Sequence, residues 1–383
     1  MGKKLSSLLL TIDYPPVEGG IAMAFSNLWI AAAPPKGLVL APKVRGWEEF
    51  DNKSPNKILR YPCLKSRSSL AKIINFLSLA IHAAWILATH SVEHLHCGQL
   101  LRTGIIGYLR KLLTGKGYIL WVYGGETRPD FFKNSAIAGL NEKVLRGADR
   151  VISNSPFTSK EFREFGLEVL EIVPGIDTKR FFPKERNEDL IREHGLNGKK
   201  VLLTCGRLVE RKGHDKMLEA LPKILEQVPD VVYLIVGDGP HRSRLEELAE
   251  RYGVADQVRF VGLVDNELLP KYYNLCDVFA MPNRAVGSIG TDTYSVEGFG
   301  MVFLEAAACG KPVIGGDSGG AVYAIDRDVN GFLVPPEDPV FLAEKIIALL
   351  KDRTLYEKLS RNGLEHVKKF TWEKSVERLK PYL

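Results

Sequence analysis

An apolar run, a glycine and a basic loop follow one another in Lys200-Val201-Leu202-Leu203-Thr204-Cys205-Gly206-Arg207-Leu208-Val209-Glu210-Arg211-Lys212-Gly213. The first six residues have the length and the apolar character of a buried strand. The next segment, Asp215–Gln227, repeats apolar residues at helical spacing. Ligands of open α/β sheets bind outside the carboxyl ends of the strands. We therefore expect Gly206–Gly213 to lie at a ligand site.

Strands and helices alternate along the whole chain, which is typical of doubly wound α/β domains. In the second half we expect, in order, the strands and helices Val231–Val236, Arg244–Tyr252, Val258–Val261, Asp277–Met281, a helix after Gly300, strands at 313–314 and Gly331–Val334, and helices Pro339–Lys351 and Leu355–Lys369. The first half shows the pattern less clearly, with expected strands Leu5–Ile12, Val92–His96, Tyr118–Tyr123 and Arg150–Ser153 and expected helices Ala22–Ala33 and Ala71–Thr89.

The length of 383 residues exceeds one ordinary core, so two domains are expected. Proline and glycine in Val173–Asp177 mark the hinge between them. The net charge of +6, from 52 basic and 46 acidic residues, is too small and too dispersed to indicate nucleic-acid binding. It suits an anionic ligand or an anionic membrane surface. Five scattered cysteines without a CxxC pair indicate buried thiols in a reducing cytoplasm.

Two apolar segments of the first half bear on membrane contact. Ala71–Thr89 is short for a bilayer span of about 20 residues and contains Lys72 and His82, so we interpret it as a helix packed on a sheet. Gln99–Thr114 mixes leucines and isoleucines with arginine and lysine. It can rest on an acidic membrane surface or face the core with solvated arginines, and the pattern leaves both open.

The stretch Val296-Glu297-Gly298-Phe299-Gly300-Met301-Val302-Phe303-Leu304-Glu305-Ala306 places two carboxylates around a glycine-containing helix start. Glycines and free N–H groups there favour a phosphate. Two acids would repel phosphate, but they suit the hydroxyls of a sugar. Glu305 interrupts an apolar run, where an unpaired charge is costly, and a ribose would satisfy it. The alternatives are that Glu297 is an exposed loop acid and that Glu305 is an early-helix acid that interacts with the helix dipole.

Arg207 and Lys212 follow a strand directly and can neutralise a departing diphosphate. The alternative is a solvated basic loop. Gly19-Gly20 opens a helix after the first strand, as a phosphate site does, although a tight turn explains it equally well. The histidines and the cysteine of 90–97 raise the question of a metal, but on a strand only His94 and His96 share one face, while the other side chains diverge. We expect no metal there, and a strand-end histidine that faces the cleft.

Together these residues resemble glycosyltransferase family 4, whose retaining enzymes have two Rossmann-like domains in the GT-B arrangement. The motifs that carry the resemblance are Gly19-Gly20, Ala148–Ser155, Pro174–Asp177, Gly206-Arg207 with Lys212, Val236–Pro240, the run from Glu297 to Glu305 with Ala308–Ile314, Ser318–Ala321 and Gly331–Val334. The spacing of Arg207 and Lys212 and the run Val296–Ala306 look most like the GDP-mannose-dependent phosphatidylinositol mannosyltransferases.

The resemblance implies a role for each matching residue. Arg207 and Lys212 would hold the diphosphate, Glu297 the hexose and Glu305 the ribose. The remaining donor contacts would come from Gly298, Phe299, Gly300, Met301 and Val302, from Val261 and Gly262 near the base, and from Gly19 and Gly20 of the first domain. No metal or other cofactor is implied.

One position departs from the family. The family has a histidine before Gly-x-Asp/Glu in the first domain, whereas Trp121-Val122-Tyr123-Gly124-Gly125-Glu126 has Tyr123 there. Tyrosine can donate a hydrogen bond but does not act as a base near neutral pH. We keep Tyr123 as a candidate catalytic residue, with Glu126 or His96 as substitutes.

These observations predict a two-domain α/β retaining hexosyltransferase, with residues 1–174 and the C-terminal helix at 370–383 forming the first domain and residues 175–369 the second. The donor would be a sugar nucleotide, GDP-mannose before others, and the acceptor a hydroxyl of a lipid or a glycan. The protein would be cytoplasmic, with peripheral contact to the inner membrane face as a further hypothesis. The alternatives are a non-catalytic nucleotide-sugar-binding subunit and a GT-B enzyme that uses UDP sugars.

Overall fold

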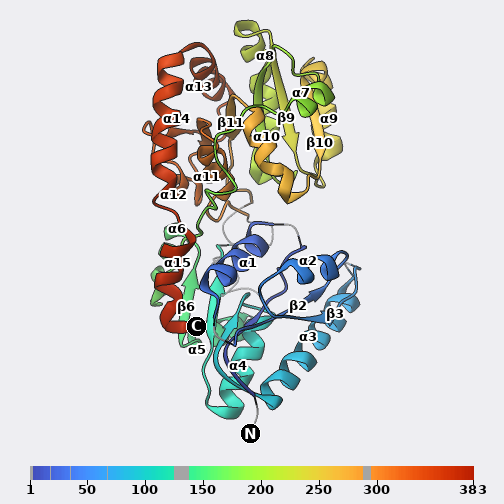
Figure 1. The fold of residues 1–383 in the computed structure, drawn as a ribbon, viewed down its shortest axis with the longest axis vertical. Helices are drawn as coiled ribbons and strands as arrows, with labels where there is room; N and C mark the ends of the chain where they lie inside the picture. The colour runs from blue at the N-terminus through green and yellow to red at the C-terminus, as the bar shows by residue number, and fades with distance from the viewer. Residues whose placement is uncertain (1–2, 18, 35, 67, 125–137, 288–294) are drawn as a thin grey trace. The chain divides into compact units, whose positions relative to one another are not determined.

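The structure is a computed structural model that describes residues 3–17, 19–34, 36–66, 68–124, 138–287 and 295–383. The chain forms two compact units (Figure 1). The first comprises Met1–Gly175 and Trp372–Leu383, and the second comprises Ile176–Thr371. The chain therefore leaves the first unit at Gly175 and returns to it at Trp372.

The first unit contains a seven-stranded parallel sheet of order β3-β2-β1-β4-β5-β6-β7. Its strands are β1 Lys3–Leu10, β2 Leu38–Lys43, β3 Ile58–Pro62, β4 His90–Cys97, β5 Ile119–Val122, β6 Arg150–Ser153 and β7 Val169–Glu171. Its helices are α1 Gly20–Ala32, α2 Trp47–Lys53, α3 Ser69–Thr89, α4 Thr103–Thr114, α5 Ala138–Gly147, α6 Pro156–Glu164 and α15 Trp372–Leu379, followed by the short η5 Lys380–Tyr382.

The second unit contains a six-stranded parallel sheet of order β10-β9-β8-β11-β12-β13. Its strands are β8 Lys200–Cys205, β9 Val231–Val236, β10 Val258–Gly262, β11 Val278–Met281, β12 Val313–Gly316 and β13 Gly331–Val334. Its helices are α7 Glu188–His194, α8 His214–Gln227, α9 Arg242–Arg251, α10 Leu269–Leu275, α11 Met301–Ala308, α12 Ala321–Ala324, α13 Pro339–Lys351 and α14 Arg353–Val367, with short 3-10 turns η2 Glu210–Lys212, η3 Ala255–Gln257 and η4 Asn266–Leu268.

Both sheets follow the doubly wound pattern, in which the strand order reverses beside the first strand of the unit. In the second unit this reversal lies between β8 and β11. The apolar strands explain the arrangement, since all six residues of β9 are buried and a parallel sheet needs helices on both faces. The α/β prediction is confirmed, and the reversal brings the loops after β8 and β11 to one edge.

The predicted elements of the second half agree closely with the structure. Strands β8, β9 and β13 and helix α13 have the predicted bounds, and the other expected elements differ by one or two residues at their ends. In the first half, β2, β3 and the three-residue β7 were not predicted. Strands β2 and β3 each contain a proline, Pro42 and Pro62 respectively, which is uncommon inside a sheet and concealed them.

The C-terminal segment packs within the first unit. Helix α15 lies against α1, and the Ser375 hydroxyl donates to the carbonyl of Val173 at 2.6 Å. The carbonyl of Tyr382 accepts from Nε2 of His96 at 2.7 Å, while Nδ1 of His96 accepts from the Trp121 indole at 3.2 Å. The expectation that a histidine of this strand end faces a cleft is therefore wrong for His96. Its ring is fully buried and both nitrogens are engaged.

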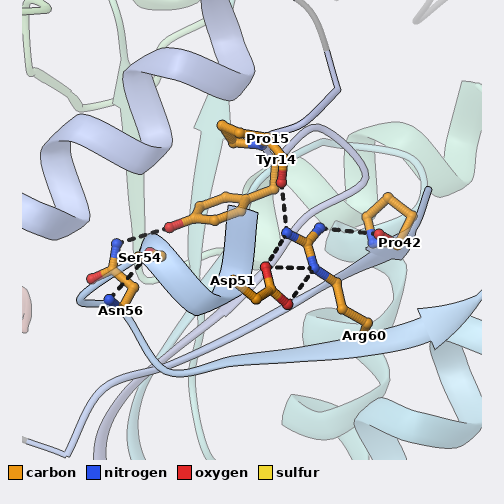
Figure 2. Close-up of polar contacts among 7 residues, drawn as sticks. All are labelled: Tyr14, Pro15, Pro42, Asp51, Ser54, Asn56 and Arg60. Atoms are coloured by element: carbon orange, nitrogen blue, oxygen red, sulfur yellow. Dashed lines mark hydrogen bonds and ion pairs between the residues drawn. The ribbon is translucent and has the colours of Figure 1, made fainter. Parts of the chain in front are cut away.

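A buried arginine fixes the loop that follows β1 (Figure 2). Arg60 on β3 pairs with the Asp51 carboxylate, with its shortest contact at 2.6 Å, and donates to the carbonyls of Pro15 and Pro42 at 2.6 and 3.0 Å. The Tyr14 hydroxyl accepts from the side chain of Asn56 at 2.9 Å. These contacts hold the backbone that leads to Gly19-Gly20.

Candidate active site

The loops after β8 and β9 are joined through their backbones. Gly206 N–H donates to the carbonyl of Val236, and Leu208 N–H donates to the carbonyl of Asp238. Gly237 has a φ of 130°, and a Cβ added there would overlap the Gly206 carbonyl. Only glycine fits this position, because both the conformation and the space exclude a side chain. The close approach fixes the basic loop at the carboxyl edge of the sheet.

Three charged side chains meet at this edge. The Lys212 ammonium lies 2.7 Å from Oε2 of Glu297, and Nη1 of Arg211 lies 2.5 Å from the same oxygen. The side chains of Glu297 and Lys212 are 12% and 8% exposed. Lys212 also lies over Gly206, since a Cβ built there would be 3.4 Å from its Cε. The predicted residues Lys212 and Glu297 are therefore in direct contact, 85 positions apart in the chain.

The two cations decide the charge of Glu297. Burial alone would raise the pKa of this carboxyl, but Lys212 and Arg211 together lower it from 4.5 to about 2. Glu297 is therefore an anion at neutral pH. Both cations are correspondingly occupied by a carboxylate that belongs to the protein.

A second ion cluster braces the same turn. Arg284, in the loop after β11, makes a bidentate pair with Asp215 at 2.9 and 2.8 Å, and its amide donates to the carbonyl of Arg211. Burial lowers the pKa of Arg284, but Asp215 and the nearby acids outweigh this effect and raise it. Asp215 lies in the first turn of α8. The pair thereby connects the loop after β8 to the loop after β11, where the strand order of the sheet reverses.

Glu297 lies in the loop that precedes α11, and Glu305 lies within that helix, as predicted. The helix begins after Gly300, whose φ is 90°. Gly320 N–H donates to the carbonyl of Glu297 at 2.7 Å, and a Cβ added at Gly320 would overlap the Gly298 carbonyl. The Ser318–Ala321 motif therefore positions the Glu297 loop through direct backbone contact.

Glu305 has a different environment from Glu297. Its Oε2 accepts from the buried Tyr273 hydroxyl at 2.5 Å. Burial raises the pKa of Glu305, and the hydrogen bond from Tyr273 lowers it by less. The sequence predicted that a ligand would satisfy this buried acid, but the protein itself supplies one partner. Within the described residues, its other carboxyl oxygen has no hydrogen-bond or ion-pair partner.

Arg207 differs from the neighbouring cations. Its side chain is exposed and has no hydrogen-bond or ion-pair partner within the part of the chain that the structure describes. Val261 and Gly262 end the edge strand β10, and the Gly262 carbonyl accepts from Gly237 N–H at 2.8 Å. The ends of β8, β9 and β10 therefore form one continuous edge. It carries Arg207, Lys212 and the predicted base-side residues.

The remaining predicted residues belong to the first unit. Gly19, with a φ of 141°, and Gly20 begin helix α1, and no atom lies within 4 Å of a Cβ built on either. Tyr123 follows β5, and its ring packs edge-on against Phe25 with the centroids 5.7 Å apart. Glu126 lies outside the described residues. Among the residues described, no group of three or more His, Cys, Asp and Glu side chains is arranged to hold a metal ion.

Arg211 is the main residue that the sequence did not indicate. It is adjacent to Lys212, and nothing in the pattern distinguishes it from a solvated side chain. Arg284 was missed for the same reason. The signal in both cases is tertiary, because the partners of Arg211 and Arg284 are 86 and 69 positions away.

Comparisons with known proteins bear on this site. Residues 186–366 match the family of glycosyl transferases group 1. The chain is 32% identical over 355 residues to the GDP-mannose-dependent alpha-(1-6)-phosphatidylinositol monomannoside mannosyltransferase of Mycolicibacterium smegmatis, covering 90% of this chain and 89% of the relative. It is 30% identical over 390 residues to the GDP-mannose-dependent monoacylated alpha-(1-6)-phosphatidylinositol monomannoside mannosyltransferase of Corynebacterium glutamicum, covering 99% and 98%. The solved structure of Anabaena HepE in complex with UDP and glucose has the same fold, with a TM-score of 0.80 at 19% identity over 98% of both chains.

Proposed function

Because this chain belongs to the family of group 1 glycosyl transferases, which use nucleotide-sugar donors, we propose that it transfers mannose from GDP-mannose to a hydroxyl acceptor with retention of the α configuration. The observation that carries the proposal is the contact of Lys212 and Arg211 with Glu297 at the carboxyl edge of the second sheet. Such an edge binds ligands in open α/β sheets. The cations suit a diphosphate and the carboxylate suits the hydroxyls of a hexose.

In the proposed reaction the bond between the anomeric carbon and the phosphate oxygen breaks, and its electron pair stays on the departing diphosphate. Arg207 and Lys212 stabilise that charge. The acceptor oxygen bonds to the anomeric carbon on the same face, and its proton passes to the departing phosphate. Glu297 orients the hexose, and Glu305 binds the ribose.

Other residues have supporting roles in this proposal. The backbone of Gly298–Val302 completes the donor pocket, and Val261-Gly262 lies near the base. Gly19-Gly20 and Tyr123 act from the first unit, where Tyr123 can donate a hydrogen bond but not remove a proton near neutral pH. No metal is required, because Arg207 and Lys212 supply the positive charge.

The acceptor that we propose is a lipid hydroxyl. The two mannosyltransferases above carry the names of enzymes that act on phosphatidylinositol monomannoside. A soluble glycan is the alternative acceptor. For a lipid acceptor the protein would lie in the cytoplasm with contact to the inner membrane face.

The donor is tested by a thermal-shift screen of GDP-, UDP- and ADP-linked sugars. GDP-mannose should raise the melting temperature most, because a ligand that binds only the folded state stabilises it. Stabilisation by a UDP sugar with no effect of GDP-mannose would exclude the proposed donor. A transfer assay then separates an enzyme from a binding subunit, which shows affinity without turnover.

Arg207→Ala sharpens the test. Because the Arg207 side chain is exposed and unpaired in the described structure, its removal should leave the melting temperature unchanged while the shift induced by GDP-mannose falls. Arg361→Ala is the matched control, since Arg361 is another exposed arginine of the same unit, on α14. An Arg207→Ala protein that responds to the donor like the parent would remove Arg207 from the site.

A further inference from the structure

Helix α3 exposes an apolar face to solvent. The large apolar side chains at positions i, i+3, i+4, i+7, i+11 and i+15 are Leu70, Ile73, Ile74, Leu77, Ile81 and Trp85, and each is at least 41% exposed. Ala84 and Ala88 complete the same face. These positions span an arc of about 120° at helical spacing, and no charged residue lies within it. A solvent-facing helix surface is ordinarily polar, so this face is unusual.

The opposite face of α3 packs into the protein. Leu79, Ala83 and Ile86 are buried and belong to the core of the first unit. Within the described residues, α3 is the one helix long and apolar enough to cross a membrane. Because these three side chains are part of a packed core, the helix can offer a bilayer only its outer face. The prediction that this segment packs on a sheet therefore holds for one side of the helix alone.

The area of the face is large for a monomer. Six large side chains, each about half exposed, present on the order of 600 Å² of apolar surface, which is the upper end of the largest patch on ordinary monomers. Such patches mark sites of interaction with proteins or membranes. Figure 1 shows α3 on the outside of the first unit.

Helix α4 adds to the surface. Its last turns expose Leu109, Leu112 and Leu113, the last of them to 83%. The chain runs from edge strand β3 through α3 to β4 and then through α4 to β5, so both crossovers move in the same direction across the sheet. Since parallel crossovers are right-handed, α3 and α4 cover the same face of the sheet.

The charge of the chain segment that contains α3 and α4 favours one kind of partner. Residues 54–117 contain nine lysines and arginines but a single acid, Glu93, which lies 3.3 Å from Lys4. Among them, the exposed side chains without an ion-pair partner in the described structure are Lys57, Lys65, Lys72 and Lys116. Lysines beside an apolar surface attract the phosphates of anionic lipids. The same charges oppose the pairing of two copies of this chain through α3, because like charges would meet.

We propose that the outer face of α3, extended by the last turns of α4, docks the protein on an anionic lipid bilayer. The helix lies flat in the interface, with its leucines and isoleucines among the acyl chains and Lys65, which precedes the helix, at the headgroups. Trp85 lies at the depth that tryptophan favours in membranes. The inference holds whichever sugar is transferred. It rests on the proposed function only where it brings the enzyme to a lipid acceptor.

The test is sedimentation of the full-length protein with vesicles. The parent should bind vesicles of phosphatidylcholine with about one third phosphatidylglycerol, and should bind pure phosphatidylcholine on the order of tenfold less. Ile73→Glu with Ile81→Glu should lose binding to the anionic vesicles. Val340→Glu is the matched control, because Val340 is 53% exposed on α13 of the second unit, and it should bind like the parent.

A second measurement separates docking from folding and from the proposed function. The double glutamate variant should keep the parent's melting temperature and its donor-induced shift, both measured without lipid. Failure of the parent to bind anionic vesicles, or equal binding by the double variant, would overturn the docking proposal and leave the donor result intact. If the parent is a dimer and the double glutamate variant is a monomer, the face serves self-association, and this result would equally overturn the docking proposal.

Discussion

Glu297→Gln gives the sharpest test of the charged cluster. The change keeps the size of the side chain but removes the negative charge that Lys212 and Arg211 share at 2.7 and 2.5 Å. These cations outweigh the effect of burial and lower the pKa of Glu297 from 4.5 to about 2. A difference of this size corresponds to about 3 kcal/mol of stabilisation of the folded state at neutral pH.

The sign of the pH dependence follows from the direction of that shift. Because the folded-state pKa is lowered, the stabilisation is fully present above pH 4.5 and is lost as the pH falls toward 2. Glu297→Gln should therefore reduce the free energy of unfolding by about 3 kcal/mol at pH 7 and by much less near pH 2. Urea denaturation at a series of pH values measures both. Glu344→Gln is the control, since Glu344 forms an exposed pair with Lys223 and should change little at any pH.

Glu297→Gln should weaken folding, as above, but strengthen the binding of a nucleoside diphosphate. With the carboxylate gone, Lys212 and Arg211 are no longer neutralised from within the protein. A nucleoside diphosphate should then bind on the order of tenfold more tightly, while transfer falls by at least a hundredfold because the hexose is no longer oriented. Calorimetry with GDP and a turnover assay give the two values. A folded Glu297→Gln protein that binds GDP more weakly, or that transfers at the parent's rate, would refute this account of the cluster.

Two further predictions concern the frame of each unit. Gly320→Ala should lower turnover by about a hundredfold, because the new methyl group overlaps the Gly298 carbonyl and displaces the Glu297 loop. Steady-state kinetics measure the turnover, and a variant as fast as the parent would show that the loop tolerates the displacement. Arg60→Met should reduce the free energy of unfolding by about 3–5 kcal/mol, because it leaves the Asp51 carboxylate unpaired in a largely buried place; urea denaturation measures it, and a change below 1 kcal/mol would show that the network in Figure 2 is not stabilising.

The sequence predicted the second unit well because strand length, apolar character and turn residues all agree there. Strand β9 is buried throughout and ends in a glycine turn, so local pattern and tertiary position coincide. Strand β3 shows the opposite case. It contains Arg60, whose burial depends on partners from Asp51, Pro15 and Pro42, and no local pattern anticipates such a set.

The same limit applies to the site and to the exposed face. The sequence pattern predicted loop positions for Lys212 and Glu297. Their contact depends on how the two loops fold against each other, and no local pattern shows this for residues 85 positions apart in the chain. Helix α3 is apolar on both faces, and periodicity cannot tell which face meets the core. Leu79 and Ile81 look equivalent in sequence, yet Leu79 is 1% and Ile81 66% exposed.

The two carboxyls of the motif are tuned in opposite directions, and this argues for separate roles. At Glu297 two cations overcome burial and keep the group ionised, whereas at Glu305 burial prevails over the hydrogen bond from Tyr273 and raises the pKa. Pairs of acids whose environments push their pKa values apart commonly divide a task. An anion at Glu297 can only accept hydrogen bonds, as the hydroxyls of a hexose require. Glu305 is instead held by the Tyr273 hydroxyl through one carboxyl oxygen, which leaves the other oxygen for a ribose hydroxyl. A site built for one ligand group would not need both environments within nine residues of one motif.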